Sequence, residues 1–172
     1  MKQIKSTLLI SVVATCFTVT NSCSQTTKPD SSTVLAVFAA STPCSEGTRP
    51  LPAIPANAAC EFIRWNLTLY QNPKTFIPTT FKLTYVFGLP QQGTPGFING
   101  GKKEEMQGQW SIVKERASNP NAIVYRLTDD KTGKTISFLK LNENLLHLLD
   151  TDGRLMIGSA AWSYTLNRMN NQ

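Results

Sequence analysis

The sequence predicts an all-β protein whose strands form a small, antiparallel, lipocalin-like β-barrel of about eight strands. In several runs, apolar residues alternate with polar ones, which is the period-two pattern of strands with one buried face. Polar segments rich in Gly, Pro, Asn and Asp separate these runs, and no convincing amphipathic helix interrupts them. Such regular spacing is typical of an antiparallel meander that closes into a barrel, with a two-sheet sandwich as the alternative.

The N-terminal residues predict export. Lys2 and Lys5 precede an apolar run at 8–14, which is the arrangement of a secretory signal. The run is too short to span a bilayer as a permanent helix of about 20 apolar residues, and a buried N-terminal helix is the alternative. We therefore divide the chain into a lipoprotein signal peptide at 1–22, a flexible tether at 23–33 and one domain at 34–172.

Cys23 is the predicted site of lipidation. Residues 20–23 (TNSC) resemble a bacterial lipobox, with a small residue directly before the cysteine. Cys16 is a rival, but cleavage there would cut the apolar run in half. Acyl chains on Cys23 would hold the protein on the outer membrane, at about 0.8 kcal/mol per buried methylene. Plain secretion without an anchor is the alternative.

The two remaining cysteines, Cys44 and Cys60, form an even pair in a domain predicted to be exported, so a disulfide is expected. The bridge would enclose 15 residues, and chain-entropy models assign about 3 kcal/mol to a loop of that length. A metal-binding or redox pair is the competing interpretation, although the spacing differs from CxxC.

The strands are expected at 34–38, 60–71, 79–88, 107–112 and 122–128, followed by four more between 136 and 168 (136–141, 145–150, 154–158 and 163–168). The runs 60–71 and 79–88 form a long hairpin whose turn begins at Asn72. Its inner face carries the following apolar residues: Ile63, Trp65, Leu67, Leu69, Phe81, Leu83, Tyr85 and Phe87. Residues 151–153 (TDG) supply turn chemistry, because Gly153 can adopt a positive φ.

Two segments are predicted to be irregular. Prolines recur between 41 and 59, where each removes a backbone donor. Residues 89–104 are rich in Gly, Pro and Gln. Phe97 and Ile98 are apolar residues in this otherwise polar loop, and they predict either a lid or contact patch, or side chains that fold back onto the barrel rim.

The sequence contains no catalytic motif, and we predict that the protein is not an enzyme and uses no cofactor or metal. His147 is the only histidine, and a metal site normally needs three or four ligands, so a structural or surface role is expected. The net charge of +6 falls to +4 without Lys2 and Lys5, and the basic residues are scattered. Nucleic-acid binding, which needs a basic stripe, is therefore not expected.

The pattern resembles the N-terminal domain of NlpE-type lipoproteins. The resemblance covers residues 34–168 and is carried by these pieces: Pro43-Cys44, Gly108 with Trp110, Tyr125 with Leu127, 138–141 (FLKL), 145–150 (LLHLLD), Gly153 and 162–167 (WSYTLN). It implies a lipocalin-like barrel on a lipid tether, with roles in envelope stress sensing, surface sensing or copper resistance. The family carries CxxC after its first strand, whereas this sequence has Gly47 three residues after Cys44.

These observations predict a monomeric, non-catalytic lipoprotein of the cell envelope. Its expected partners are the membrane, through the lipid on Cys23, and an envelope protein or small ligand. Because the sequence ends at Gln172, we expect no second domain of the kind that signalling members carry. The alternative function is a lipocalin-like carrier of a small apolar ligand inside the barrel. An open, apolar cavity would favour the carrier, and an interior filled by side chains would favour an interaction module.

Overall fold

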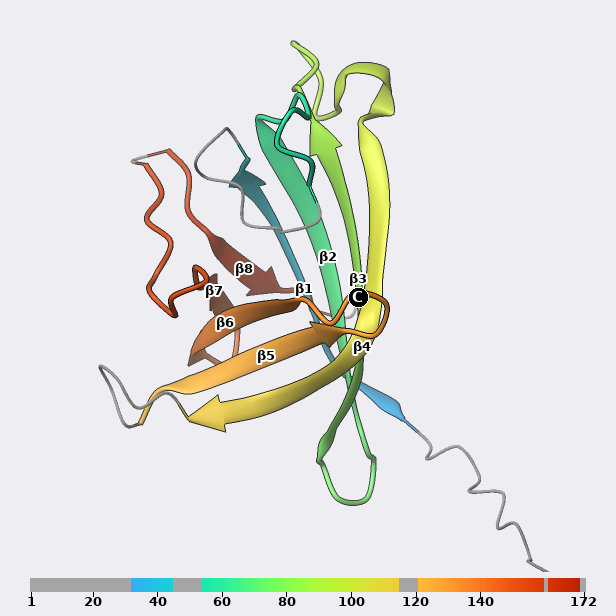
Figure 1. The fold of residues 1–172 in the computed structure, drawn as a ribbon, viewed down its shortest axis with the longest axis vertical. Helices are drawn as coiled ribbons and strands as arrows, with labels where there is room; N and C mark the ends of the chain where they lie inside the picture. Colours follow the sequence, from blue (N-terminus) through green and yellow to red (C-terminus); the bar gives the residue numbers. More distant parts are fainter. Residues whose placement is uncertain (1–31, 45–53, 115–120, 160, 171–172) are drawn as a thin grey trace, which may run out of the picture.

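The computed structural model describes residues 32–44, 54–114, 121–159 and 161–170, and these form a closed, eight-stranded antiparallel barrel (Figure 1). Each strand pairs with the next in sequence, and β8 returns to pair with β1. The predicted all-β barrel is thus confirmed. The elements are β1 (Thr33–Pro43), β2 (Phe62–Gln71), β3 (Pro78–Gly88), the 3-10 turn η1 (Ile98–Gly100), β4 (Lys102–Lys114), β5 (Ile123–Asp129), β6 (Thr135–Asn142), β7 (Leu145–Leu148) and β8 (Thr165–Arg168).

The β2–β3 hairpin has the inner face that the alternation predicted. All eight apolar residues assigned to it are buried, whereas the intervening Arg64, Asn66 and Lys82 are exposed. Leu67 lies opposite Leu83, and neither side chain is exposed to solvent. Side chains on this face therefore enter the barrel as cross-strand pairs, the unit that stabilises a sheet.

Strand β4 begins earlier than expected and bends strongly across the barrel (Figure 1). Its start at Lys102 shortens the predicted irregular segment. Gly108 faces inward opposite Asp129, and a Cβ atom there would lie 2.0 Å from the Thr128 carbonyl oxygen. The glycine before Trp110 is thus required by the close approach of β4 and β5.

The stretch from 136 to 168 contains three strands, so the prediction of a fourth at 154–158 was wrong. Strand β7 pairs directly with β8, which leaves no sheet position for the intervening segment. That segment makes one isolated bridge, between Leu149 and Leu155, and its apolar side chain Ile157 is exposed. The local pattern of Leu, Met and Ile resembled a strand, but the pairing partners were already occupied.

The predicted turn at 151–153 is confirmed. Gly153 has φ +77°, and its N–H donates to the Asp150 carbonyl. The Asp150 carboxylate accepts hydrogen bonds from the backbone N–H groups of Asp152 and Arg154, both at 2.9 Å. These bonds lower the pKa of Asp150, with the Arg154 backbone N–H as the largest cause. The aspartate thus has the local turn role that its position indicated.

The two ends of the barrel differ in construction (Figure 1). One end, which we call the hairpin end, carries the β2–β3 turn at 72–77 beside the start of β1. The opposite end, the disulfide end, carries Cys44, Cys60 and the β3–β4 connection. In the described part of the chain, no helix has the length and apolar character needed to cross a membrane.

Candidate functional site

The predicted disulfide between Cys44 and Cys60 is present. It joins the residue after β1 to the loop that precedes β2, with the two Cα atoms 5.4 Å apart. Both cysteines are buried, and the Cys44 N–H donates to the Glu61 carbonyl at 2.8 Å. Because both sulfurs are bonded to one another, the competing metal-binding interpretation loses its thiolates. The bridge fixes the disulfide end of the barrel.

Cys23, the predicted lipidation site, lies outside the described residues, as do the signal peptide at 1–22 and all of the tether except its last two residues. The described chain begins at the hairpin end, where the Ser32 and Thr79 hydroxyls are 3.1 Å apart. Strand β1 therefore begins beside the β2–β3 turn.

His147 has a structural role. Its Nε2 atom lies 2.9 Å from the Met156 carbonyl oxygen, and its Nδ1 atom lies 2.9 Å from the Thr165 hydroxyl. A carbonyl oxygen only accepts, so Nε2 donates to Met156, and in the neutral ring Nδ1 accepts from the Thr165 hydroxyl. The ring thereby fastens the segment after β7 to β8, and both nitrogens are used.

Within the described residues, no three His, Cys, Asp or Glu side chains gather as a metal site. Asp129, the one buried acid there, closes the β5–β6 turn: its carboxylate accepts from the Thr132 hydroxyl at 2.6 Å and from the Thr132 N–H at 3.0 Å. The hydroxyl bond is the largest cause of its lowered pKa. The Asp129 carboxylate therefore stabilises the β5–β6 turn and does not act as a metal ligand.

The barrel interior is filled by side chains. An internal void wide enough for water leaves accessible surface on the residues that line it. The inward residues that are no more than 2 % exposed include Ile63, Trp65, Leu67, Leu69, Phe81, Leu83, Leu127, Phe138, Leu146, Leu148 and Leu166. A small pocket of about 30 Å³ lies beside Phe38, Tyr125 and Leu146, and the exposed residues Asn142 and Glu143 also line it. This packing offers no support to the carrier of an apolar ligand.

Two indole groups inside the barrel are hydrogen-bonded within it. The Trp65 indole N–H donates to the buried Thr42 hydroxyl at 2.8 Å, and the Trp110 indole N–H donates to the Tyr70 carbonyl at 2.6 Å. Burial raises the pKa of Tyr85, and the Glu104 and Asp129 carboxylates raise it further. A tyrosine that is harder to ionise makes a poor base or nucleophile at neutral pH.

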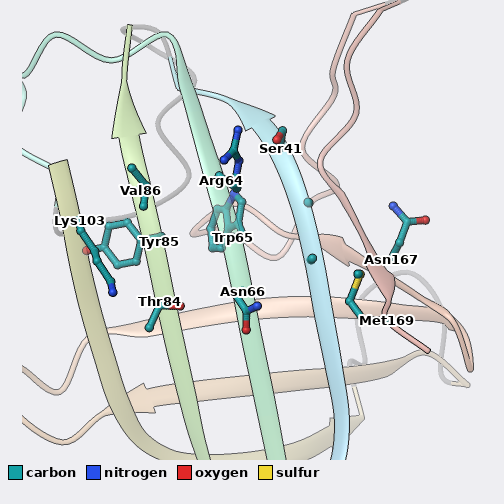
Figure 2. Close-up of a pocket in the computed structure, with 12 residues that line it drawn as sticks. Ser41, Arg64, Trp65, Asn66, Thr84, Tyr85, Val86, Lys103, Asn167 and Met169 are labelled. Carbon is teal, nitrogen blue, oxygen red and sulfur yellow. The ribbon is translucent and has the colours of Figure 1, made fainter. Parts of the chain in front are cut away.

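A groove of about 480 Å³, which we call the outer groove, crosses the outside of β1–β4 (Figure 2). Its cations are Arg64 from β2 and Lys103 from β4, and Val86 of β3 lies in register between them. The Arg64 guanidinium donates to the Pro95 carbonyl and lies 5.5 Å from the centre of the Phe97 ring. Arg64 therefore holds the β3–β4 loop against the barrel.

The two apolar residues singled out in that loop, Phe97 and Ile98, differ in their exposure to solvent. Phe97 is buried and packs back onto the rim, whereas Ile98 remains 50 % exposed. Ile98 lines a second groove of about 400 Å³ at the disulfide end, the rim groove, together with Ala58, Phe87 and Leu89. An apolar groove open to solvent suits a protein partner better than a chemical reaction.

Comparison with known proteins adds no relative: no family model, no curated protein and no solved structure matches this chain.

Sequence reasoning did miss one surface feature. Phe76 and Ile77 are highly exposed in the β2–β3 turn. The available signal was two large apolar residues within a turn, a place where polar residues are usual.

Proposed function

We propose that this protein is a non-catalytic cell-envelope lipoprotein of the NlpE type, anchored in the outer membrane by lipid on Cys23, whose barrel acts as an interaction module. The observation that carries this proposal is the packed interior. A barrel without room for a ligand inside can bind a partner only at its outer surfaces or its ends. Export and lipidation rest on the signal-like residues 1–22 and on Cys23. The disulfide supports export, because such bonds persist in oxidising compartments.

The rim groove supports a protein partner at the disulfide end. Leu89 and Ile98 are exposed there beside buried Phe87, and Lys102 provides charge at the edge. Apolar surface rimmed by polar groups is typical of protein contact sites. Among the roles that the family resemblance implies, this arrangement favours envelope stress sensing through a partner.

We expect lipidation to depend on Cys23 alone. Cells that express the full chain should incorporate radiolabelled palmitate into it, and the protein should fractionate with the outer membrane. Cys23→Ala should abolish both labelling and membrane association, because no other acceptor for the acyl chains is predicted. Cys16→Ala is the matched control and should leave both unchanged. A Cys23→Ala protein that still carries palmitate would refute Cys23 as the site of the anchor.

Copper tolerance, another implied role, has a separate test. Cu(I) prefers soft thiolate and thioether ligands, and the Cys44 and Cys60 sulfurs are bonded to each other. We therefore expect neither Cu(I) nor Cu(II) to change the melting temperature of the oxidised protein. A concentration-dependent rise in melting temperature with either ion would instead place copper among its ligands.

A further inference from the structure

We propose that the tip of the β2–β3 hairpin, Phe76 and Ile77, inserts into the surface of a phospholipid bilayer and orients the barrel on it. Phe76 is 70 % exposed and Ile77 60 % exposed. They are neighbours at the end of a hairpin that projects from the barrel beside the start of β1 (Figure 1). A pair of large apolar side chains at a projecting tip is suited to shallow burial among lipid headgroups and acyl chains.

The backbone N–H groups of the turn leading to the tip are hydrogen-bonded within the turn. The Asn72 carboxamide oxygen accepts from the N–H groups of Lys74 and Thr75, at 2.9 and 3.1 Å. The Phe76 N–H donates to the Asn72 carbonyl, and the Asn72 N–H donates to the Ile77 carbonyl, both at 2.9 Å. Pro73 has no N–H, so every backbone N–H from 72 to 76 is hydrogen-bonded or absent. Dehydrating this turn therefore leaves none of these donors without a partner.

Charge also fits a lipid surface. No acidic residue occurs between Gln71 and Thr80, so insertion buries no carboxylate. Lys74 is exposed within the turn, where its ammonium can remain among headgroups while its methylenes lie alongside the apolar pair. A lysine at this depth is attracted to anionic phospholipids.

The backbone conformation of Phe76 indicates that its side chain serves binding at the surface and not the folding of the turn. Its φ of +58° lies in the left-handed region, where a bulky residue is strained and glycine is not. Glycine at this position would therefore give a less strained turn. A strained aromatic residue at an exposed position is consistent with a binding function for the side chain.

The position of the predicted anchor matches this orientation. Ser32 follows Cys23 by nine residues, and at about 3.6 Å per residue this length of chain spans no more than about 32 Å. Ser32 contacts Thr79, two residues beyond the tip. A lipid on Cys23 would thus keep the tip close to the bilayer and direct the rim groove away from it. This last step rests on the proposed function, whereas the tip itself does not.

The test supplies the anchor artificially, so that it is independent of lipidation. The full chain carries Cys23→Ala, and six histidines are inserted directly after position 23. These histidines bind nickel-chelating lipid in vesicles of phosphatidylethanolamine and phosphatidylglycerol, and so hold the protein on the vesicle surface. In the Phe76→Trp variant, bromine atoms on the acyl chains should quench the new tryptophan. Trp65 and Trp110 are buried and Trp162 is far along the chain from the tip, so the unsubstituted protein supplies the background. Ile98→Trp, at the disulfide end, is the matched control and should not be quenched.

A second variant excludes a folding role. Phe76→Gly should melt at the same temperature or higher, yet bind vesicles with limiting nickel lipid about tenfold more weakly, which is the scale expected from losing one partly buried aromatic side chain. If bromine leaves the emission of the Phe76→Trp variant at its background level, the proposal is overturned, and so it is if the protein dimerises through its tips instead. Failure of palmitate to label Cys23 would remove the natural anchor and leave this result unaffected.

Discussion

Replacing Trp65 with alanine should lower the free energy of unfolding by about 3–5 kcal/mol, the range typical of large aromatic residues truncated in a core. The indole is 1 % exposed and meets the Phe138 ring edge-on, with the ring centres 6.2 Å apart. Its removal leaves a cavity in the centre of the barrel. It also leaves the buried Thr42 hydroxyl without the indole N–H that donates to it. Chemical unfolding followed by circular dichroism measures the loss.

Two further variants identify the source of this effect. Asn66→Ala, one residue along on the exposed outer face of β2, should change stability by less than about 0.5 kcal/mol. Trp65→Phe keeps most of the ring and removes the hydrogen bond to Thr42, so it should cost less than Trp65→Ala. A Trp65→Ala protein as stable as the unsubstituted one would contradict a packed interior and restore the carrier as the better function.

Reducing the Cys44–Cys60 bridge should lower the free energy of unfolding by about 3 kcal/mol, because the loop it closes is restricted in the unfolded chain as well as in the folded one. Both cysteines are buried. We expect the melting temperature to fall in dithiothreitol, and the unfolded but unreduced protein to show no free thiol from this pair.

The matched control is the double variant Cys44→Ala, Cys60→Ala. It should melt near the temperature of the reduced protein and should not respond to dithiothreitol. Two free thiols from these residues in the unreduced, unfolded protein would show that the bridge does not form in the isolated protein. That result would reopen the interpretation of this pair as metal ligands.

The local sequence pattern was sufficient to predict which side chains are buried where apolar and polar residues alternate. The faces of β2 and β3 follow from period two alone, because successive side chains in a strand point to opposite sides. Turn chemistry identified the loop around Gly153 for the same local reason. Period two is less reliable at a strand terminus: Ile123, the first residue of β5, is exposed although it alternates with the buried Tyr125 and Leu127.

The candidate surfaces were less accessible to sequence reasoning than the strands. The residues of the outer groove come from β1, β2, β3, β4 and the end of the chain, and only pairing of the strands brings Arg64 and Lys103 to one face. Phe97 and Ile98 are adjacent and equally apolar, but one packs on the rim and the other faces solvent. Which of them is buried depends on the contact with Arg64, a residue 33 positions away from Phe97.

The sequence by itself determined the all-β class, the inner faces of the long hairpin and the one cysteine pair available for a disulfide, since these depend on local periodicity and on simple counting. The tertiary structure decided that β8 closes on β1, that 154–158 lies outside the sheet and that the interior is full. It also decided that the apolar tip at Phe76 and Ile77 lies beside the start of β1. These outcomes depend on which distant strands pair and on how their side chains fill a shared volume, and neither is recorded in a local pattern.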